Sequence, residues 1–424
     1  MKNIKGTGNG GLGIVLQLPT VDRPLSTAHF YCNGQFAISM VLILLLFPCL
    51  AMGVDIPTAV PVNGPAFNAE SISIDGKGQI TFQTAGQKRQ MPLGDLVAWG
   101  ECLEPKRTPI LVLSDGGLLV ADVVAVDKET ASVESQLFGR LKLPLSDVAG
   151  VVYRLPAEVK DRDALFDRII QATGKSDRLI LDNGDELAGV IESIKESAVS
   201  INTDVGQIAI NFDRITSIIF NPTSRRKISS EEPKIWLGFI DGSRLIVSGL
   251  QLDASGMQFT MMGQTWKSDP KNLVFIQPLT SRTIYLSDLR PSEYQFVPFL
   301  DLNWPYCMDR SVTGSFLRAD GALYLKGIGM HSTARLIYKL DRPYKRFQAE
   351  LAIDDSTQGS GSVQFRVFVD GQDKFTSGII RGGMKPLPIS VDISGAKRLD
   401  LIVEFADRAD VQDHADWLNA RLVK

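Results

Sequence analysis

Two short segments near the C-terminus of this chain combine histidine, carboxylate and aromatic side chains. The first is Lys326-Gly327-Ile328-Gly329-Met330-His331-Ser332, and the second is Asp413-His414-Ala415-Asp416-Trp417. They hold two of the chain's three histidines. A sugar needs an apolar ring face for its C–H surface, and donors and acceptors for its hydroxyl groups. The two segments supply both kinds of group, so sugar binding is the chemistry that we expect of them.

The candidate sugar-binding residues come from these segments and from one expected loop, Asn303-Trp304-Pro305-Tyr306. A structural alternative exists for each of them. A lone histidine inside a β-sandwich often makes only a structural hydrogen bond, and a tryptophan fits a hydrophobic core as well as it fits a stacking surface. The candidates are His331, His414, Asp416, Trp417, Trp304 and Tyr306.

Metal binding is a second chemistry to consider for the carboxylates. Asp354, Asp355 and Asp416 could hold a structural calcium ion through hard oxygen ligands. The spacing of an EF-hand loop is absent, and neither histidine is accompanied by a His-x-x-x-His or Cys/His cluster. Calcium at Asp354 and Asp355 is therefore the one metal site that the sequence suggests, and no other cofactor is expected.

Catalysis finds little support in the sequence. A glycosidase needs two carboxyl groups held across the scissile bond, whereas adjacent residues of a strand, such as Asp354 and Asp355, point to opposite faces. The chain has no Gly-x-Ser-x-Gly nucleophile elbow, and neither Cys102 nor Cys307 lies in a recognisable catalytic context. We therefore expect a protein that binds its ligand without transforming it.

The C-terminal third, residues 282–424, resembles the NPCBM domain, a type of carbohydrate-binding module often attached to glycoside hydrolases, including those of family 98. The resemblance implies a jelly-roll, galactose-binding-like β-sandwich that binds sugar by aromatic stacking and hydrogen bonds and carries out no chemistry. Its matching segments, in order, are Tyr285–Leu289, Asp309–Val312, Lys326–His331, Tyr344–Phe347, Ile353–Asp355, Gly361–Val367, Val369–Gly371 and Asp413–Trp417.

The middle of the chain contains an internal repeat. Three segments share a strand, an Asp-Gly or Asn-Gly turn, further short strands and a closing apolar strand. The turn glycines Gly116, Gly184 and Gly242 precede the closing strands by 32, 31 and 31 residues. Asp-Gly and Asn-Gly favour tight hairpins, because the central residues of such turns need positive φ. Each repeat therefore predicts a small, partly open β-barrel that packs on its neighbours.

The pattern also divides the chain into segments. A half copy of the repeat is expected before the first full one, because Met91–Leu96 matches Leu143–Val148 in pattern. A helix is expected after Pro156, with Gly174 as its end. The predicted domains are a signal peptide or membrane anchor (1–53), the half repeat and first repeat (54–156), a helical linker (157–176), the second repeat (177–222), a charged linker (223–233), the third repeat (234–280) and the NPCBM-like domain (282–424).

The apolar run Phe36–Phe47 at the start of the chain is followed by Ala51-Met52-Gly53, which fits a signal-peptide cleavage site. The competing interpretation is an uncleaved anchor, but the run is short for a span of roughly 20 residues. A signal peptide predicts secretion or a place in the periplasm or cell envelope of a bacterium. In such an oxidising compartment Cys102 and Cys307 could pair, and the sequence leaves this open.

Composition restricts the partners. The chain has 45 Lys and Arg against 48 Asp and Glu, and no basic patch interleaved with aromatic residues, so nucleic acid is not expected. The sequence thus predicts an all-β, non-catalytic, exported protein whose C-terminal domain binds a glycan. The alternatives are an envelope protein–protein scaffold without sugar binding, with the repeats as its partner surface, and a protein associated with glycoside hydrolysis. The identity of the sugar and the oligomeric state stay open.

Overall fold

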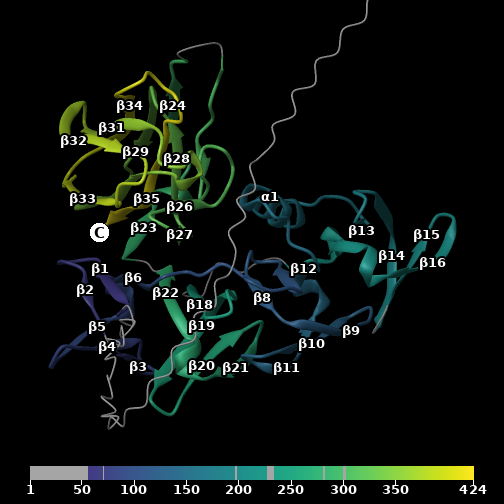
Figure 1. Cartoon of the computed structure of the whole chain (residues 1–424). Helices are drawn as coiled ribbons and strands as arrows, with labels where there is room; N and C mark the ends of the chain where they lie inside the picture. Colours follow the sequence, from purple (N-terminus) through teal and green to yellow (C-terminus); the bar gives the residue numbers. More distant parts are fainter. Residues whose placement is uncertain (1–55, 70, 196–197, 227–233, 280–281, 299–301) are drawn as a thin grey trace, which may run out of the picture. The chain divides into compact units, whose positions relative to one another are not determined.

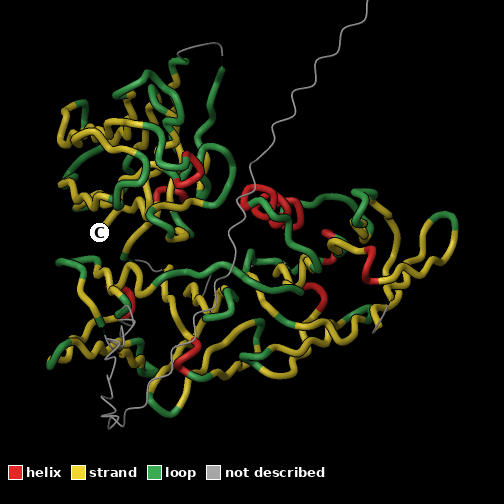
Figure 2. Tube along the Cα trace, viewed as in Figure 1, coloured by secondary structure: helices red, strands yellow, loops and turns green. Residues whose placement is uncertain are grey.

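The computed structural model describes residues 56–69, 71–195, 198–226, 234–279, 282–298 and 302–424. These residues form strands joined by turns, with one α-helix among them (Figures 1 and 2). The predicted all-β fold class is therefore confirmed. The expected signal peptide or anchor lies outside the described residues. Within the described part of the chain, no helix is long and apolar enough to span a bilayer.

Residues 58–279 form four β-units with one strand order, which we call units A to D. In each unit the first strand pairs with the fifth and the second, the second bends and pairs with the third, and the third pairs with the fourth. No described pairing joins the fourth and fifth strands, so each unit is an open, bent sheet. A 3₁₀ turn links these two strands in every unit: η1 (Leu93–Asp95), η2 (Leu145–Asp147), η3 (Phe212–Arg214) and η5 (Pro270–Asn272).

The strand bounds of the units show that the expected half copy is a complete unit. In units A and B two consecutive labelled strands, the second and third of each list, together make the second strand of the unit. Unit A contains β1 (Thr58–Pro61), β2 (Phe67–Asn68), β3 (Ser71–Ile74), β4 (Gln79–Thr84), β5 (Gln87–Pro92) and β6 (Leu96–Gly100). Unit B contains β7 (Ile110–Leu113), β8 (Leu118–Val120), β9 (Asp122–Val126), β10 (Thr130–Ser135), β11 (Gly139–Pro144) and β12 (Val148–Val152). Unit C contains β13 (Asp177–Leu181), β14 (Glu186–Lys195), β15 (Ala198–Thr203), β16 (Gly206–Asn211) and β17 (Ile215–Ile219). Unit D contains β18 (Lys234–Phe239), β19 (Arg244–Asp253), β20 (Gly256–Met261), β21 (Gln264–Ser268) and β22 (Leu273–Leu279).

The first hairpin of units B, C and D has the chemistry that the sequence predicts. The turn glycines Gly116, Gly184 and Gly242 have φ of 92°, 86° and 84°. The residue before each glycine accepts a hydrogen bond from a backbone N–H two residues ahead of itself, as in Asp241 Oδ1 from Ser243 N at 2.8 Å. Such a side-chain bond fixes a turn locally. Local chemistry therefore favours the first turn of units B, C and D.

The units associate in pairs through equivalent strands. The fifth strands β6 and β22 pair antiparallel, which joins unit A to unit D, and β12 and β17 join unit B to unit C in the same way. The far ends of the second strands also pair, at Leu252 with Ile74 and at Ile194 with Val126. Two antiparallel contacts between equivalent strands are what a local two-fold relation produces. One continuous apolar core runs through the units.

Helix α1 (Val159–Ile170) is the helix expected between the repeats. It buries Leu165, Phe166 and Ile169 against unit B. Its C-terminal carbonyl groups are bound by Arg225, which donates to Ile170 O at 2.7 Å and to Ile169 O at 2.9 Å. A cation at this end of a helix satisfies carbonyl groups that lack intrahelical partners. Arg225 thus closes the helix instead of lying free in the charged linker.

Residues 282–424 form a two-sheet antiparallel sandwich, as predicted for the jelly roll. One sheet has the order β25-β28-β35-β30-β33, with β23 beside β35, and the other has the order β24-β29-β34-β31-β32. The core between them is apolar. The strands are β23 (Thr283–Tyr285), β24 (Glu293–Phe296), β25 (Cys307–Met308), β26 (Leu317–Ala319), β27 (Ala322–Tyr324), β28 (Gly327–His331), β29 (Ala334–Lys339), β30 (Arg346–Ile353), β31 (Ser362–Val369), β32 (Gln372–Arg381), β33 (Leu387–Asp392), β34 (Arg398–Phe405) and β35 (His414–Val423).

The sandwich meets α1 through a buried ion-pair network. Arg318 donates to both carboxylate oxygens of Asp163, at 2.7 and 3.0 Å, and to Glu104 at 2.6 Å. Arg310 binds Asp167 in the same two-oxygen manner. Burial by itself lowers the pKa of Arg318, but the hydrogen bonds to Asp163 and Glu104 outweigh it and raise the pKa. Arg318 therefore stays charged.

Gly150 tests the pairing of the closing strands. A Cβ at this position would lie 2.2 Å from the carbonyl oxygen of Ile218 and 2.8 Å from Ile169. We expect Gly150→Ala to destabilise the protein by about 1–3 kcal/mol, the usual cost of overpacking, measured as a shift in the denaturant midpoint. Gly256→Ala is the control, because nothing lies within 4 Å of its Cβ. Equal shifts for both variants would contradict the strand contact.

Candidate functional site

The strands bring His331 and His414 together with Trp304. His331 ends β28, His414 begins β35, and the two residues are direct cross-strand partners. Their ring centroids lie 6.0 Å apart. The Trp304 ring stacks on His331 at 4.7 Å with an interplanar angle of 1°, and its centroid lies 5.6 Å from that of His414. Three of the predicted site residues therefore form one cluster, which we call the Trp–His cluster.

The two histidines of the cluster are neutral at physiological pH. Burial lowers the pKa of His331, and the neighbouring His414 lowers it further. Burial also lowers the pKa of His414, partly opposed by the carboxylate of Asp354. A neutral imidazole offers one N–H donor and one acceptor. His331 Nδ1 is buried without a hydrogen-bond partner among the described residues, and His414 Nδ1 lies 3.4 Å from Ser356 Oγ.

Tyr306 supports the loop that carries Trp304. Its ring packs edge-on against Tyr294 at 5.0 Å, and the Tyr294 hydroxyl donates to the backbone oxygen of Trp304 at 2.8 Å. Trp304 itself is half-buried, so it is the most exposed ring of the cluster. The structure thus gives Trp304 the position suited to ligand contact and packs Tyr306 against β24.

Trp417 and Asp416 do not join the cluster surface. Trp417 has no exposed surface and packs in the sandwich core, 4.9 Å edge-on from Phe365 and 6.0 Å from Phe347. The expectation that Trp417 stacks on a sugar is therefore wrong, and the core alternative holds. Asp416 is also completely buried. Burial raises its pKa well above the usual range, and the neighbouring carboxylate of Asp354 raises it further, so both favour the protonated form of Asp416.

Asp354 and Asp355 stabilise a hairpin. Asp354 accepts hydrogen bonds from the backbone N–H groups of Ser356 and Arg318, and Asp355 accepts from those of Asp320 and Gly321. In the part of the chain that the structure describes, no three His, Cys, Asp or Glu side chains gather as a metal site. The suggested calcium site at these two residues therefore lacks a ligand set, and the carboxylates instead hold the β26–β27 hairpin.

The two remaining cysteines of the described chain are free. Cys102 is buried and forms an isolated backbone bridge with Leu323, whereas Cys307 begins β25. Burial raises the pKa of Cys102 to about 11, so its thiol stays protonated at neutral pH. Neither of the two is an activated nucleophile.

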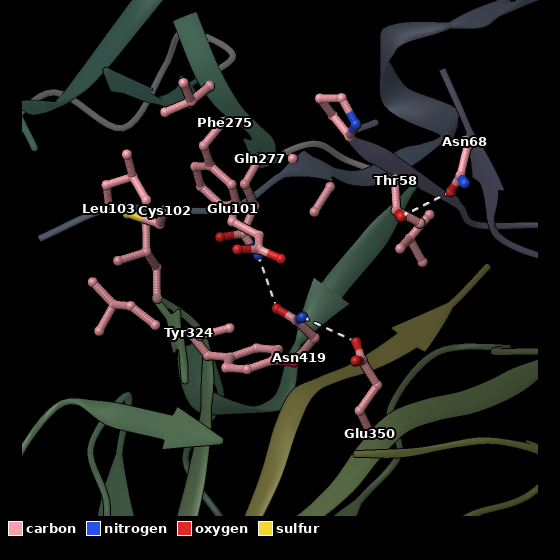
Figure 3. Close-up of a pocket in the computed structure, with 18 of the residues that line it drawn as sticks. Thr58, Asn68, Glu101, Cys102, Leu103, Phe275, Gln277, Tyr324, Glu350 and Asn419 are labelled. Carbon is pink, nitrogen blue, oxygen red and sulfur yellow. Dashed lines mark hydrogen bonds between the residues drawn. The ribbon is translucent and has the colours of Figure 1, made fainter. Parts of the chain in front are cut away.

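A hollow lies where the units meet the sandwich, with a volume of about 640 Å³ (Figure 3). Asn419 accepts from Gln277 Nε2 at 3.0 Å and donates to Glu350 Oε1 at 3.2 Å on its wall. Burial raises the pKa of the Tyr324 hydroxyl, as do the carboxylates of Glu350 and Glu101. A phenol ring beside amides and carboxylates can hold a polyhydroxylated ligand.

The sequence reasoning missed this junction hollow. Its residues come from strands far apart in the chain, so no local pattern marks them. The positive φ of 48° at Asn419, next to a shift in the β30–β35 register, turns this residue to its position on the wall. A bulge of this kind leaves no trace in the alternation of the sequence.

Comparison with known proteins assigns the sandwich to a domain family. The family model described as NPCBM/NEW2 domain matches residues 282–423. Residues 282–423 are an NPCBM/NEW2 domain. The resemblance seen in the sequence motifs is thus confirmed for the C-terminal third of the chain.

Relatives of the NPCBM/NEW2 domain occur within larger enzymes. Alpha-1,3-galactosidase B of Akkermansia muciniphila is 36% identical over 116 residues, which are 26% of this chain and 14% of that protein. The chain therefore spans a small share of this curated relative. A solved CBM51 from Clostridium perfringens GH95, in complex with methyl-galactose, is 26% identical; it covers 33% of this chain and 99% of its own, with a TM-score of 0.30. The CBM51-2 and INT domains of Clostridium perfringens ZmpB, in complex with GlcNAc, are 24% identical and cover 52% of this chain and 44% of their own, with a TM-score of 0.31.

The core position of Trp417 generates a stability prediction. Trp417→Ala leaves a large cavity between the sheets of the NPCBM/NEW2 domain, so we expect a loss of about 3–5 kcal/mol. Chemical denaturation followed by intrinsic fluorescence measures it. Phe405→Ala, at an exposed position on β34, is the control and should change stability little. A Trp417→Ala protein as stable as this control would place the indole at the surface.

Asp413 generates a pH prediction. Burial raises the pKa of this carboxyl to about 6, although it accepts a hydrogen bond from Ser362 N at 2.9 Å. A carboxyl whose pKa is raised in the folded state contributes stability that is complete below about pH 4 and is lost as the pH rises through 6. The Tm of Asp413→Asn, relative to the unmodified chain, should therefore rise between pH 4 and pH 7.

Asp392 provides the control of opposite sign. Hydrogen bonds from the backbone N–H and the hydroxyl of Ser394 lower its pKa, so Asp392→Asn should lose relative stability as the pH rises. A flat pH dependence for Asp413→Asn would refute the role of Asp413 burial.

Proposed function

We propose that this chain is an exported, non-catalytic carbohydrate-binding protein, whose NPCBM/NEW2 domain holds a sugar at the Trp–His cluster. The observation that carries the proposal is the convergence of Trp304, His331 and His414 from one loop and two paired strands. Trp304 offers the aromatic face for the C–H surface of a sugar ring. The neutral imidazoles of His331 and His414 are only 2% and 7% exposed, so each would offer a donor or an acceptor to a sugar hydroxyl through that small exposed surface.

Galactose-type sugars are the first ligands to test. A segment of this chain is similar to part of an alpha-1,3-galactosidase, and modules of this family accompany glycoside hydrolases. A binding module raises the effective concentration of the protein that carries it near the bound glycan, and it does so without any chemistry of its own. The cluster would then anchor the chain to galactose-containing glycans outside the cell.

Trp304→Ala tests the proposal. We expect the full chain to bind galactose or N-acetylgalactosamine in titration calorimetry, and the variant to lose about tenfold or more in affinity, since stacking of one ring contributes on the order of 1 kcal/mol beyond area burial. Phe405→Ala, an exposed aromatic of the same domain outside the cluster, should bind normally. Equal binding by both variants, or no binding on a broad glycan array, would refute the proposal.

A protein–protein scaffold is the second candidate function, because units A to D make up more of the described chain than the NPCBM/NEW2 domain does. The units would bind envelope proteins, and the sandwich would hold no sugar. Recovery of one stable partner, unaffected by competing free sugars and unchanged by Trp304→Ala, would favour the scaffold over the lectin.

Glycoside hydrolysis is the third candidate, and Glu101 and Glu350 in the junction hollow are the carboxylates to examine. Release of sugar from a panel of glycosides, abolished by Glu350→Gln, would establish it. We expect no release from either protein.

A further inference from the structure

A second cavity between the units and the sandwich contains an unpaired buried cation. The cavity has a volume of about 320 Å³ and is lined by residues of units B and D, helix α1 and the sandwich. Arg244, the first residue of β19, lies on its wall with only 4% of its surface exposed. We call this cavity the Arg244 pocket.

The guanidinium of Arg244 makes no hydrogen bond or ion pair with any described residue, although the Arg244 backbone pairs with β18 and β8. Its guanidinium lies over the ring of Phe316 at 4.4 Å. Burial lowers the pKa of Arg244, and Arg310, a like charge over the same ring at 4.1 Å, lowers it further; the charges of Cys102, Asp163 and Glu104 partly oppose this effect. Burying a cation without a partner is costly, so native structures normally supply an anion.

The neighbouring carboxylates are already bound by other cations. Asp163 and Glu104 attract Arg244 through space, but both are bound by Arg318. Arg310 is held by both oxygens of Asp167, and Lys326 is held by Asp288 at 2.6 Å and Asp309 at 2.7 Å. The cations that line the pocket are Lys234, Arg244, Arg310 and Lys326, against the carboxylates Asp167 and Asp309. Two positive charges therefore lack an acidic partner on the pocket wall.

The shape and the remaining wall indicate what kind of anion fits. A cavity of about 320 Å³ is far larger than a bare ion and reaches the lower end of the range of small-ligand sites. Trp236, half-buried on β18, contributes an aromatic surface to the same wall. A fork-shaped guanidinium matches the two oxygens of a carboxylate or sulfate group, and an indole matches a sugar ring.

We propose that the Arg244 pocket is a binding site for an acidic sugar, whose carboxylate or sulfate group pairs with Arg244 while its ring lies against Trp236. The site is separate from the Trp–His cluster. The proposed ion pair between Arg244 and the acidic group of the ligand does not depend on the binding of a neutral sugar at that cluster. The carboxylate of a uronic acid and the sulfate ester of a sulfated sugar share the oxyanion that the pocket recognises.

Titration calorimetry on the full chain at constant ionic strength tests the site with four probes: glucuronate, galactose 6-sulfate, inorganic sulfate and galactose. We expect one of the two acidic sugars to bind at least tenfold more tightly than sulfate, and the tighter one identifies the oxyanion. Arg244→Met should abolish this binding. Trp236→Ala should weaken the acidic sugar at least fivefold and leave inorganic sulfate unchanged.

Three controls separate the site from a structural role, from surface charge and from the sugar-binding function of the Trp–His cluster. A structural arginine would lower Tm when replaced, whereas removal of an unpaired buried charge should keep or raise the Tm of ligand-free Arg244→Met. Arg140→Gln, a highly exposed arginine of unit B, should bind like the unmodified chain. Trp304→Ala should affect galactose alone, so failure of the cluster and failure of the pocket give different results.

Three outcomes would overturn the proposal. One is the absence of binding by every anionic probe. Another is acidic-sugar binding that survives both Arg244→Met and Arg244→Gln in proteins that melt cooperatively. The third is equal affinity for inorganic sulfate and the acidic sugars, unchanged by Trp236→Ala, which would exclude the sugar ring.

Discussion

The structure depends on a carboxylate buried at the junction of helix and sandwich. Asp163 is 2% exposed and accepts from two guanidinium nitrogens of Arg318 and from the backbone N–H of Phe316. A buried charge is tolerated only when such donors surround it, because removal of one partner leaves an uncompensated ion. The requirement fixes α1 against the segment 316–318. It thereby shapes the Arg244 pocket, which Phe166, Asp167 and Phe316 line.

Local patterns predicted the strands and turns well. The Asp-Gly and Asn-Gly turns act through their own backbone and side chains, so units B, C and D could be read from spacing alone. For unit A the sequence pattern predicts only half a copy. The structure shows a first turn at Asn63-Gly64, where Gly64 has φ of 95°, and this glycine precedes the closing strand at Leu96 by the same interval as in unit B. Two prolines, Pro61 and Pro65, flank this turn and hide its hairpin pattern.

The candidate site shows where local patterns fail. His414 and Trp417 are three residues apart in one strand, so strand alternation sends them to opposite faces. The same alternation that seats Trp417 in the core places His414 beside His331 on the other face of the sheet. This could have been predicted from the spacing. The stacking of Trp304 on His331 could not, because a loop 27 residues earlier in the chain supplies that ring.

The paired closing strands have a further consequence for the behaviour of the chain. An edge strand with unpaired N–H and C=O groups can pair with a strand of another polypeptide. Here β6 and β22 pair along these edges, as do β12 and β17, so the edges are covered. A fragment that contains only one unit of a pair would expose the edge of its fifth strand. The pairing of the four described units therefore protects the chain against self-association through these edges.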